Sequence, residues 1–444
     1  MSRHNGKTNA SVSYSIQLRR ALAEFLPRQG LRLLPNDDKE RWTPRYLVIT
    51  AVLMACLGTD RLIDRFHAAR VCLIRMYLTR RRPGQSYQGF VGALQRLGDA
   101  LLDELAQHLR CQVQCVAPGR WLIDGWLVFG CDGSRFDKTR TQANHKAFGC
   151  GGRKKTAPQQ FLTTLFHVST GLPWCWRAGN ADASERDQLR QMLHLVPQKA
   201  LLLMDAGYVG YDLLRQIMDS GRQFIIRVGA NVELLDGLGW HWKESREGVV
   251  SLWPKHAQDH SNPPLTLRLV SVIDAKGRRV HLLSSVLERS RLTDAAVRRM
   301  YKLRWGIEVL FRSIKQTMDL RKAKSWTPAA SAQELEWGMM GVWLLGLMAL
   351  QKQARKAEQG STPTSQWSAG KTLRLIRRAI HGSMGRGPSL AAKLQDAVRD
   401  GYRRRGPRAS ADYPRKKREK PPGDPRQRLA TRSEVRIAAR LKAA

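Results

Sequence analysis

The chain has 444 residues, of which 76 are Lys or Arg and 37 are Asp or Glu, giving a formal net charge of +39. Hydrophobic residues make up 42% of the chain, which argues against a disordered protein, and the length suggests two or three domains. A charge this far from zero is self-repelling without a polyanion. Nucleic acid is the first candidate for that polyanion, and an anionic membrane surface is the second.

The first part of the chain has helical periodicity. Apolar residues recur at helical spacing in residues 15–26, 45–57, 60–78 and 90–109. We therefore predict a helical, basic N-terminal domain over residues 1–120. Such a domain suits DNA recognition, but no helix-turn-helix signature is evident, so a plain helical bundle remains the alternative.

No segment predicts a membrane protein. The longest apolar runs, 47–58 and 338–350, are too short to span a bilayer comfortably and are typical of buried helices. The seven cysteines are scattered, and no apolar signal region opens the chain, which favours reduced thiols in a cytosol. We expect a cytoplasmic, nucleoid-associated protein with no membrane partner.

From Trp121 the pattern changes to short apolar strands that alternate with helices. The predicted strands are 126–131, 160–168, 172–178, 200–204 and 223–228, and the helices are 185–196 and 211–221. This order predicts an α/β core with a mixed sheet. Residues 229–291 are strand-rich and irregular, which indicates an inserted β region. Helices return from Thr293, and the Arg/Lys/Pro-rich end, residues 402–444, is expected to be mobile in isolation.

Two apolar runs end in an aspartate. WLVFGCDGSRF contains Asp132, and ALLLMDAGYVG contains Asp205. A buried strand that ends in a carboxylate followed by glycine would place the acid in an accessible crevice at the edge of the sheet. Either aspartate alone is weak evidence, because Asp near Gly is ordinary turn chemistry. Asp124 and Asp137 are nearby alternatives to Asp132, but neither ends an apolar strand.

Residues 301–316, YKLRWGIEVLFRSIKQ, predict one amphipathic helix with a lone acid. At 100° per residue, Tyr301, Arg304, Glu308 and Lys315 lie within roughly 60° of one another, beside an apolar stripe. A solvated Arg304–Glu308 pair is the plain alternative, contributing a few tenths of a kcal/mol. That pair leaves the tyrosine and the lysine on the same line unexplained.

The three acids together suggest a metal site. Carboxylates from Asp132, Asp205 and Glu308 could hold two Mg²⁺ ions, with Mn²⁺ as a possible substitute, because hard cations prefer oxygen ligands. Two such ions stabilise the attacking and leaving oxygens of a phosphoryl transfer. Tyr301, Arg304 and Lys315 would then bind DNA phosphates near the metals.

The spacing Y-x2-R-x3-E-x6-K, from Tyr301 to Lys315, resembles the signature of DDE transposases of the insertion-sequence-4 group. CDGS at Asp132 and MDAGY at Asp205 resemble the first and second aspartate motifs of that group, in the same order. The resemblance covers roughly residues 121–350. It implies a ribonuclease-H-like catalytic fold with a β-rich insertion, Mg²⁺-dependent cleavage at the ends of a mobile element, joining of those ends to target DNA, and a dimer that pairs two ends.

One feature departs from the family. Its members carry a tryptophan ahead of an LLTS-like segment, where it stacks on a flipped-out base. Here the segment is HLLSS, preceded by Val280. The candidates for the stacking residue are His281 and, earlier in the insertion, Trp240, Trp242 and Trp253. A structural role is the alternative for each tryptophan, and the hairpin mechanism stays open.

We therefore predict a bacterial-type transposase with three parts. A helical DNA-binding domain spans residues 1–120, a ribonuclease-H-like catalytic domain with a β insertion at about 229–291 spans 121–350, and a helical, basic region with a mobile tail spans 351–444. Its partner would be double-stranded DNA, from both the transposon ends and the target. The alternatives are a catalytically inactive or repurposed DNA-binding protein, and a metal-dependent nuclease that never joins strands.

Overall fold

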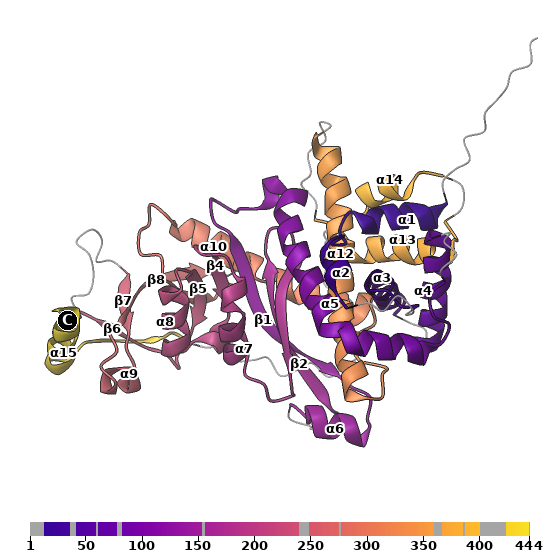
Figure 1. Cartoon of the computed structure of the whole chain (residues 1–444). Coiled ribbons are helices and arrows are strands. Elements are labelled where there is room, and N and C mark those ends of the chain that lie inside the picture. Colours follow the sequence, from indigo (N-terminus) through magenta and orange to yellow (C-terminus); the bar gives the residue numbers. More distant parts are fainter. Residues whose placement is uncertain are drawn as a thin grey trace, which may run out of the picture.

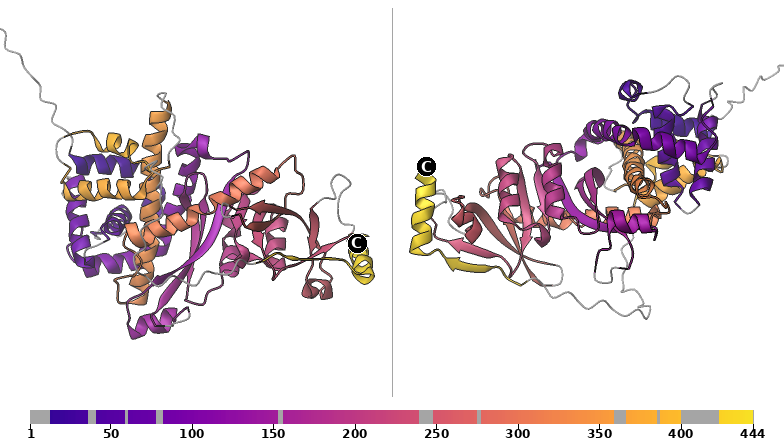
Figure 2. Two further views of the ribbon diagram at one scale, coloured as in Figure 1. Left: turned by 180° about the vertical axis from the view of Figure 1, so that it is seen from behind. Right: turned by 60° about the horizontal axis from the view of Figure 1, so that its bottom comes forward.

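The computed structural model describes residues 13–35, 41–58, 61–77, 82–152, 156–238, 248–274, 277–358, 366–384, 387–399 and 423–443. The molecule is elongated, with a helical body at one end, a long sheet through the middle and the last helix at the far end (Figures 1 and 2). Within these ranges, no helix is long and apolar enough to cross a membrane.

The helical body combines segments from both ends of the chain. Its helices are α1 (Tyr14–Ala23), α2 (Gly30–Leu33), α3 (Pro44–Cys56), α4 (Leu62–Met76), α5 (Tyr87–Val116), α12 (Pro328–Glu358), α13 (Ala369–His381) and α14 (Leu390–Gln395). The central helix is α12, which packs against α3, α5, α13 and α14 and also against β3 of the sheet (Figure 1). Both apolar runs, 47–58 and 338–350, lie in buried helices of this body.

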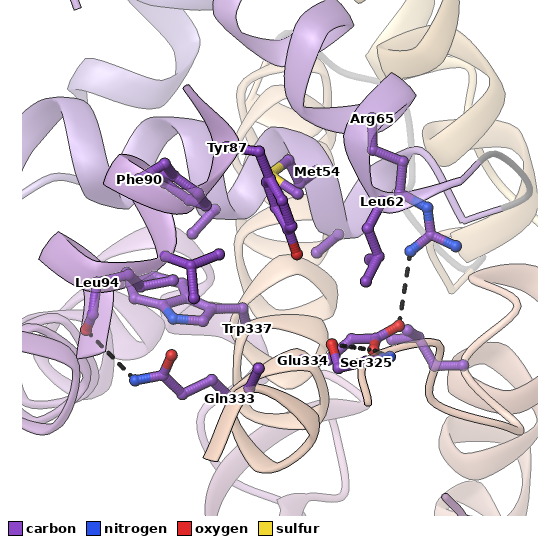
Figure 3. Close-up of a pocket in the computed structure, with 15 residues that line it drawn as sticks. Met54, Leu62, Arg65, Tyr87, Phe90, Leu94, Ser325, Gln333, Glu334 and Trp337 are labelled. Carbon is purple, nitrogen blue, oxygen red and sulfur yellow. Dashed lines mark hydrogen bonds and ion pairs between the residues drawn. The ribbon is translucent and has the colours of Figure 1, made fainter. Parts of the chain in front are cut away.

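A buried polar network fastens α4 to the segment that precedes α12. Arg65 on α4 donates a hydrogen bond to the carbonyl of Gly58 and lies 3.8 Å from the carboxylate of Glu334 on α12. Glu334 also accepts hydrogen bonds from the backbone N–H groups of Lys324 (2.9 Å) and Ser325 (3.0 Å). Figure 3 shows Arg65 and Ser325 both pointing toward Glu334, next to an apolar pocket. The network ties the segment before α12 to the helical body.

The described residues form one ten-stranded mixed sheet, in the order β10-β6-β7-β8-β9-β5-β4-β1-β2-β3. The strands of its core are β1 (Val128–Asp137), β2 (Gln159–His167), β3 (Leu172–Gly179), β4 (Leu201–Met204) and β5 (Gln223–Val228). The first three strands form an antiparallel meander, and β4 and β5 run parallel to β1. The helix α7 (Glu185–Met192) connects β3 to β4, and α8 (Tyr211–Asp219) connects β4 to β5. This is the predicted ribonuclease-H-like arrangement.

The predicted β-rich insertion extends the core sheet. It comprises β6 (Glu233–Asp236), β7 (Val249–Leu252), α9 (Lys255–Asp259), β8 (Leu265–Ile273) and β9 (Arg279–Ser284). Because β9 pairs antiparallel with β5, the strands of the insertion and of the core form one continuous sheet.

The end of the chain is ordered against the far edge of this sheet. The strand β10 (Arg426–Leu429) pairs parallel with β6, and α15 (Arg432–Ala443) follows it (Figure 1). Arg428 joins the two elements, since it donates hydrogen bonds to Glu233 (2.9 Å) and to Glu434 (2.8 Å). The segment 423–443 is therefore docked, contrary to the expectation of a tail that is mobile throughout. Residues 402–422 lie outside the described residues.

Candidate active site

Asp132 and Asp205 occupy matching positions on neighbouring strands. The parallel pairing of β1 with β4 places Val128 beside Leu201 and Gly130 beside Leu203. Two residues further, the same register places Asp132 beside Asp205, which directly follows β4. Neighbouring strands lie about 4.8 Å apart, so the two carboxyl groups share one edge of the parallel pair. Their Oδ1 atoms each accept a 2.9 Å hydrogen bond, from the N–H of Gly133 and of Gly207 respectively.

The expected position of Asp132 at the end of its strand is wrong. The strand β1 runs on to Asp137, because β2 pairs with it from residue 129 through residue 137. The neighbouring parallel strand β4 ends at Met204, beside this part of β1. Asp132 therefore lies at the point where β1 loses β4 as its pairing partner. Asp137 lies roughly 16 Å further along β1 and accepts a hydrogen bond from Gln159 (2.8 Å). Asp124 pairs instead with Arg299.

Residues 301–316 form a broken helix, contrary to the prediction of a single one. The helix α10 (Asp294–Leu303) ends before Arg304, α11 (Gly306–Arg312) follows, and Ser313–Thr317 is a π-helical turn. A Cβ atom at Gly306 would lie 2.9 Å from the ring of Phe166 on β2, so glycine allows the backbone to approach the sheet closely here. This approach carries Glu308, in the first turn of α11, toward β1.

Arg304 is an electrostatic neighbour of all three acids. Its Nη1 lies 3.4 Å from Oδ2 of Asp132, and the two side chains are only 16% and 20% exposed. Burial would lower the pKa of Arg304, but Tyr301 and the carboxylates of Asp132, Asp205 and Glu308 outweigh burial and raise it. Within the described chain, the ion pair of Arg304 is thus to Asp132, whereas the solvated-helix alternative predicts a pair with Glu308.

The acids also affect one another. Burial raises the pKa of Asp132, the charge of Asp205 raises it further, and Arg304 opposes both. Burial likewise raises the pKa of Glu308, with Asp132 adding to the effect. A fourth acid, Glu185, has its pKa raised to about 7 by burial and by the charges of Asp132 and Asp205. Asp132 is therefore an electrostatic neighbour of Asp205, Glu308 and Glu185.

Tyr301 and Lys315 border this cluster. Burial raises the pKa of Tyr301, and the guanidinium of Arg304 lies 5.8 Å from the centre of its ring. Lys315 lies in the π-helical turn. Its Nζ donates a hydrogen bond to Oγ of Ser134 (2.7 Å) and lies 4.8 Å from the centre of the Phe136 ring. Lys315 thus contacts β1, whereas the charged neighbours of Tyr301 are Arg304, Arg227 on β5 and Asp205.

The donor set suits a divalent cation. Among the described residues, no three His, Cys, Asp or Glu side chains already converge as a metal-binding cluster. Carboxylate oxygens are nevertheless the ligands that Mg²⁺ and Mn²⁺ prefer, and the charge of a bound cation stabilises neighbouring carboxylates that would otherwise repel one another. Asp132, Asp205 and Glu308 therefore fit the metal by their chemistry and charge.

Two candidates for a base-stacking residue are buried. His281 on β9 hydrogen-bonds to Ser271 (3.0 Å) and Asp424 (2.8 Å) and is 6% exposed. Trp253 is 3% exposed, and its indole N–H donates to the carbonyl of Asn262 (2.7 Å). Both side chains are held by protein partners. Residues 240 and 242, the other two candidates, lie outside the described residues.

The mixed sheet carries Asp132 and Asp205 at matching positions on neighbouring parallel segments, and Glu308 lies on a later helix. Residues 131–344 match the transposase DDE domain family, and this match implies a phosphoryl-transfer enzyme. The chain therefore carries a DDE transposase domain, and enzymes with this domain generally use divalent metal ions.

The chain is similar to a curated protein and, more distantly, to a solved structure. The chain is 26% identical, over 330 residues, to the transposase InsG of insertion sequence element IS4 from Escherichia coli (strain K12). The matched region covers 70% of this chain and 72% of the relative. The cryo-EM structure of a piggyBac transposase synaptic complex with hairpin DNA matches 89% of this chain and 84% of that chain, at 11% identity and a TM-score of 0.40. A likeness this slight carries no weight for function.

Proposed function

We propose that this chain is a transposase that cleaves DNA at the ends of an insertion sequence and joins those ends to target DNA. The supporting observation is that Asp132, on β1, and Asp205, directly after β4, lie at matching positions of the sheet. The charges of both aspartates and of Glu308 act on the same side chain, Arg304. Acids from three separate segments of the chain would repel one another without a cation. Bound metal ions would offset this repulsion, which is why the arrangement supports a metal-dependent reaction.

In this proposal Asp132, Asp205 and Glu308 bind two Mg²⁺ ions, and Mn²⁺ substitutes for them. Ions held there would stabilise the attacking and leaving oxygens of the phosphoryl transfer. Arg304 and Lys315 bind backbone phosphates, and the Tyr301 hydroxyl donates a further hydrogen bond. Arg304 also neutralises Asp132 in the metal-free protein.

The proposed partner is double-stranded DNA, from the element ends and from the target. The net charge of +39 supports a polyanionic partner, since Lys and Arg release counterions from the DNA backbone on binding. Action on chromosomal DNA would bring the protein to the nucleoid. A homodimer that pairs two ends would allow both to be cut in one complex.

The test is incubation with DNA that carries the candidate terminal inverted repeats, Mg²⁺ and a target plasmid. End cleavage and joined products are expected for the native chain, and neither is expected for Asp205→Asn. Cleavage without joining would favour the nuclease that never transfers strands. DNA binding without cleavage would favour a repurposed DNA-binding protein.

A further inference from the structure

Glu185 is an acid beside the two aspartates that the three-acid scheme leaves without a role. It is the first residue of α7, which Ser184 caps through a hydrogen bond from the N–H of Asp187 (3.3 Å). The helix packs against β1, β2 and β3. Glu185 is therefore positioned by a structural element separate from those that carry Asp132, Asp205 and Glu308.

The carboxyl group of Glu185 lies between the two aspartate positions. A Cβ atom at Gly133, the residue after Asp132, would lie 2.6 Å from Oε1 of Glu185. A Cβ atom at Gly207, two residues after Asp205, would lie 3.9 Å from Oε2. The ring of Phe161 also lies close to Gly133, at 2.4 Å from the same Cβ position, so the absence of a side chain at Gly133 leaves room for both the ring and the carboxyl group.

A buried hydroxyl points to the same place. The side chain of Tyr208 is fully buried, and within the described residues its hydroxyl forms no hydrogen bond of good geometry. It lies beside the carboxyl of Glu185 and the thiol of Cys131. An unsatisfied buried hydroxyl costs free energy, and a small rotation toward an ionised Glu185 would satisfy it. Tyr208 is thus placed to orient the Glu185 carboxylate once that group carries its full charge.

A purely structural role for Glu185 is the alternative. Acids in the first turn of a helix are stabilised by the helix dipole, and Arg135 lies near enough to attract the carboxylate. Asp187 shares the dipole effect in the same turn, yet it is 59% exposed and paired with Arg190 (2.7 Å). A helix needs no carboxylate buried between two other acids in order to gain this stabilisation.

We propose that Glu185 is a fourth carboxylate ligand of the metal site, binding a divalent ion directly or through one water, with Tyr208 as its positioning residue. This proposal rests on the proposed function, because it presumes that Asp132 and Asp205 bind the same ions. It predicts that removing the charge of Glu185 lowers metal affinity, and not only activity.

The test measures Mn²⁺ binding to the full chain, by electron paramagnetic resonance of free Mn²⁺ during a titration. Glu185→Gln should weaken binding by about tenfold or more, and Tyr208→Phe should weaken it less. Asp187→Asn, which makes the same chemical change in the same helical turn, should bind Mn²⁺ as the native chain does. Should Glu185→Gln fail to fold, as judged by circular dichroism, Glu185→Asp replaces it, and the shorter side chain should also bind Mn²⁺ less tightly.

Asp132→Asn, measured alongside, separates the two proposals. Loss of Mn²⁺ affinity in Asp132→Asn, with native affinity in the Glu185 variant, would overturn the role of Glu185 and leave the proposed function standing. Native affinity in both variants would overturn the proposed function itself. An equal loss in Asp187→Asn and Glu185→Gln would show a general charge effect and would also overturn the role of Glu185.

Discussion

Replacing Asp132 with asparagine should abolish metal-dependent DNA cleavage, and the same change at Asp137 should not. The amide removes one of three anionic metal ligands, and losing about 4 kcal/mol of transition-state stabilisation slows a reaction by about three orders of magnitude. Asp137 lies on the same strand, but it is held by Gln159 and is remote from Asp205. It therefore serves as the matched control.

The effect of Asp132→Asn on folding should be small, because two electrostatic effects oppose each other. At an effective dielectric constant of about 20, carboxylates about 5 Å apart repel each other by about 3 kcal/mol, and the variant relieves this repulsion. The variant also removes the attraction between Asp132 and Arg304, whose charged atoms lie 3.4 Å apart, and this attraction is of similar size. Arg304 keeps Asp205 and Glu308 as electrostatic neighbours. We expect the free energy of unfolding to change by no more than about 1 kcal/mol.

The assay is cleavage of end-labelled inverted-repeat DNA in Mg²⁺, paired with urea unfolding and with DNA binding in EDTA. The expected result for Asp132→Asn is native binding, near-native unfolding and no cleavage. If Asp137→Asn abolished cleavage and Asp132→Asn did not, the first acid would be misassigned. Normal cleavage by Asp132→Asn, Asp205→Asn and Glu308→Gln alike would refute the transposase mechanism for this chain.

Three further predictions concern Lys315, the basic tail and Glu434. Lys315→Ala should slow cleavage at least tenfold while changing the free energy of unfolding by less than about 1 kcal/mol, since the hydrogen bond of Lys315 to Ser134 is partly exposed. A loss of stability as large as the loss of transition-state stabilisation would make the role of Lys315 structural. Replacing the basic run 415–418 with glutamines should flatten the logarithmic salt dependence of DNA binding by about one unit for each phosphate that the tail no longer binds, and an unchanged slope would contradict DNA binding by the tail. The hydrogen bond from Arg428 lowers the pKa of Glu434 from 4.5 to about 2, so this carboxylate stabilises the docked tail above pH 4.5 and the stabilisation is lost as the pH falls toward 2. Amide hydrogen exchange in α15, corrected for its intrinsic rate, should therefore rise over that pH range in the native chain but not in Glu434→Gln.

Much of the fold can be predicted because it follows local periodicity. The run 200–204 is uniformly apolar, as a strand buried on both faces must be, and it includes β4. The run 223–228 is apolar except for the half-buried Gln223 and Arg227, and it forms β5. The N-terminal helices are recognisable by their apolar spacing and by capping residues such as Thr43 and Ser86. The sequence singles out Asp132 and Asp205 because each follows an apolar run, but their alignment depends on the parallel pairing of β1 with β4.

The features that sequence reasoning misses depend on contacts between distant segments. The stretch GSRFD after Asp132 is typical of a turn, and its pairing with β2 keeps residues 133–137 in β1. Next to the break in residues 301–316, Gly306 packs against the ring of Phe166, a contact with a residue far away in the sequence. Glu185 has one local signal, an acid at the start of a capped helix, but its neighbours Gly133 and Gly207 are known only from the fold.

The break between α10 and α11 also explains how a lone acid among bases can join a cluster of acids. A continuous helix would place Arg304 and Glu308 in its interior, where the helix dipole favours neither charge. The break places Arg304 at the C-terminal cap of α10 and Glu308 in the first turn of α11. A cation at a helix C-terminus and an anion at a helix N-terminus are each favoured, by a few tenths of a kcal/mol in helices this short. The same break lets Gly306 lie against Phe166, which brings both charges to the sheet. Local backbone geometry therefore offsets part of the repulsion that Glu308 meets beside Asp132, and Arg304 is positioned to neutralise Asp132 until a metal ion is bound.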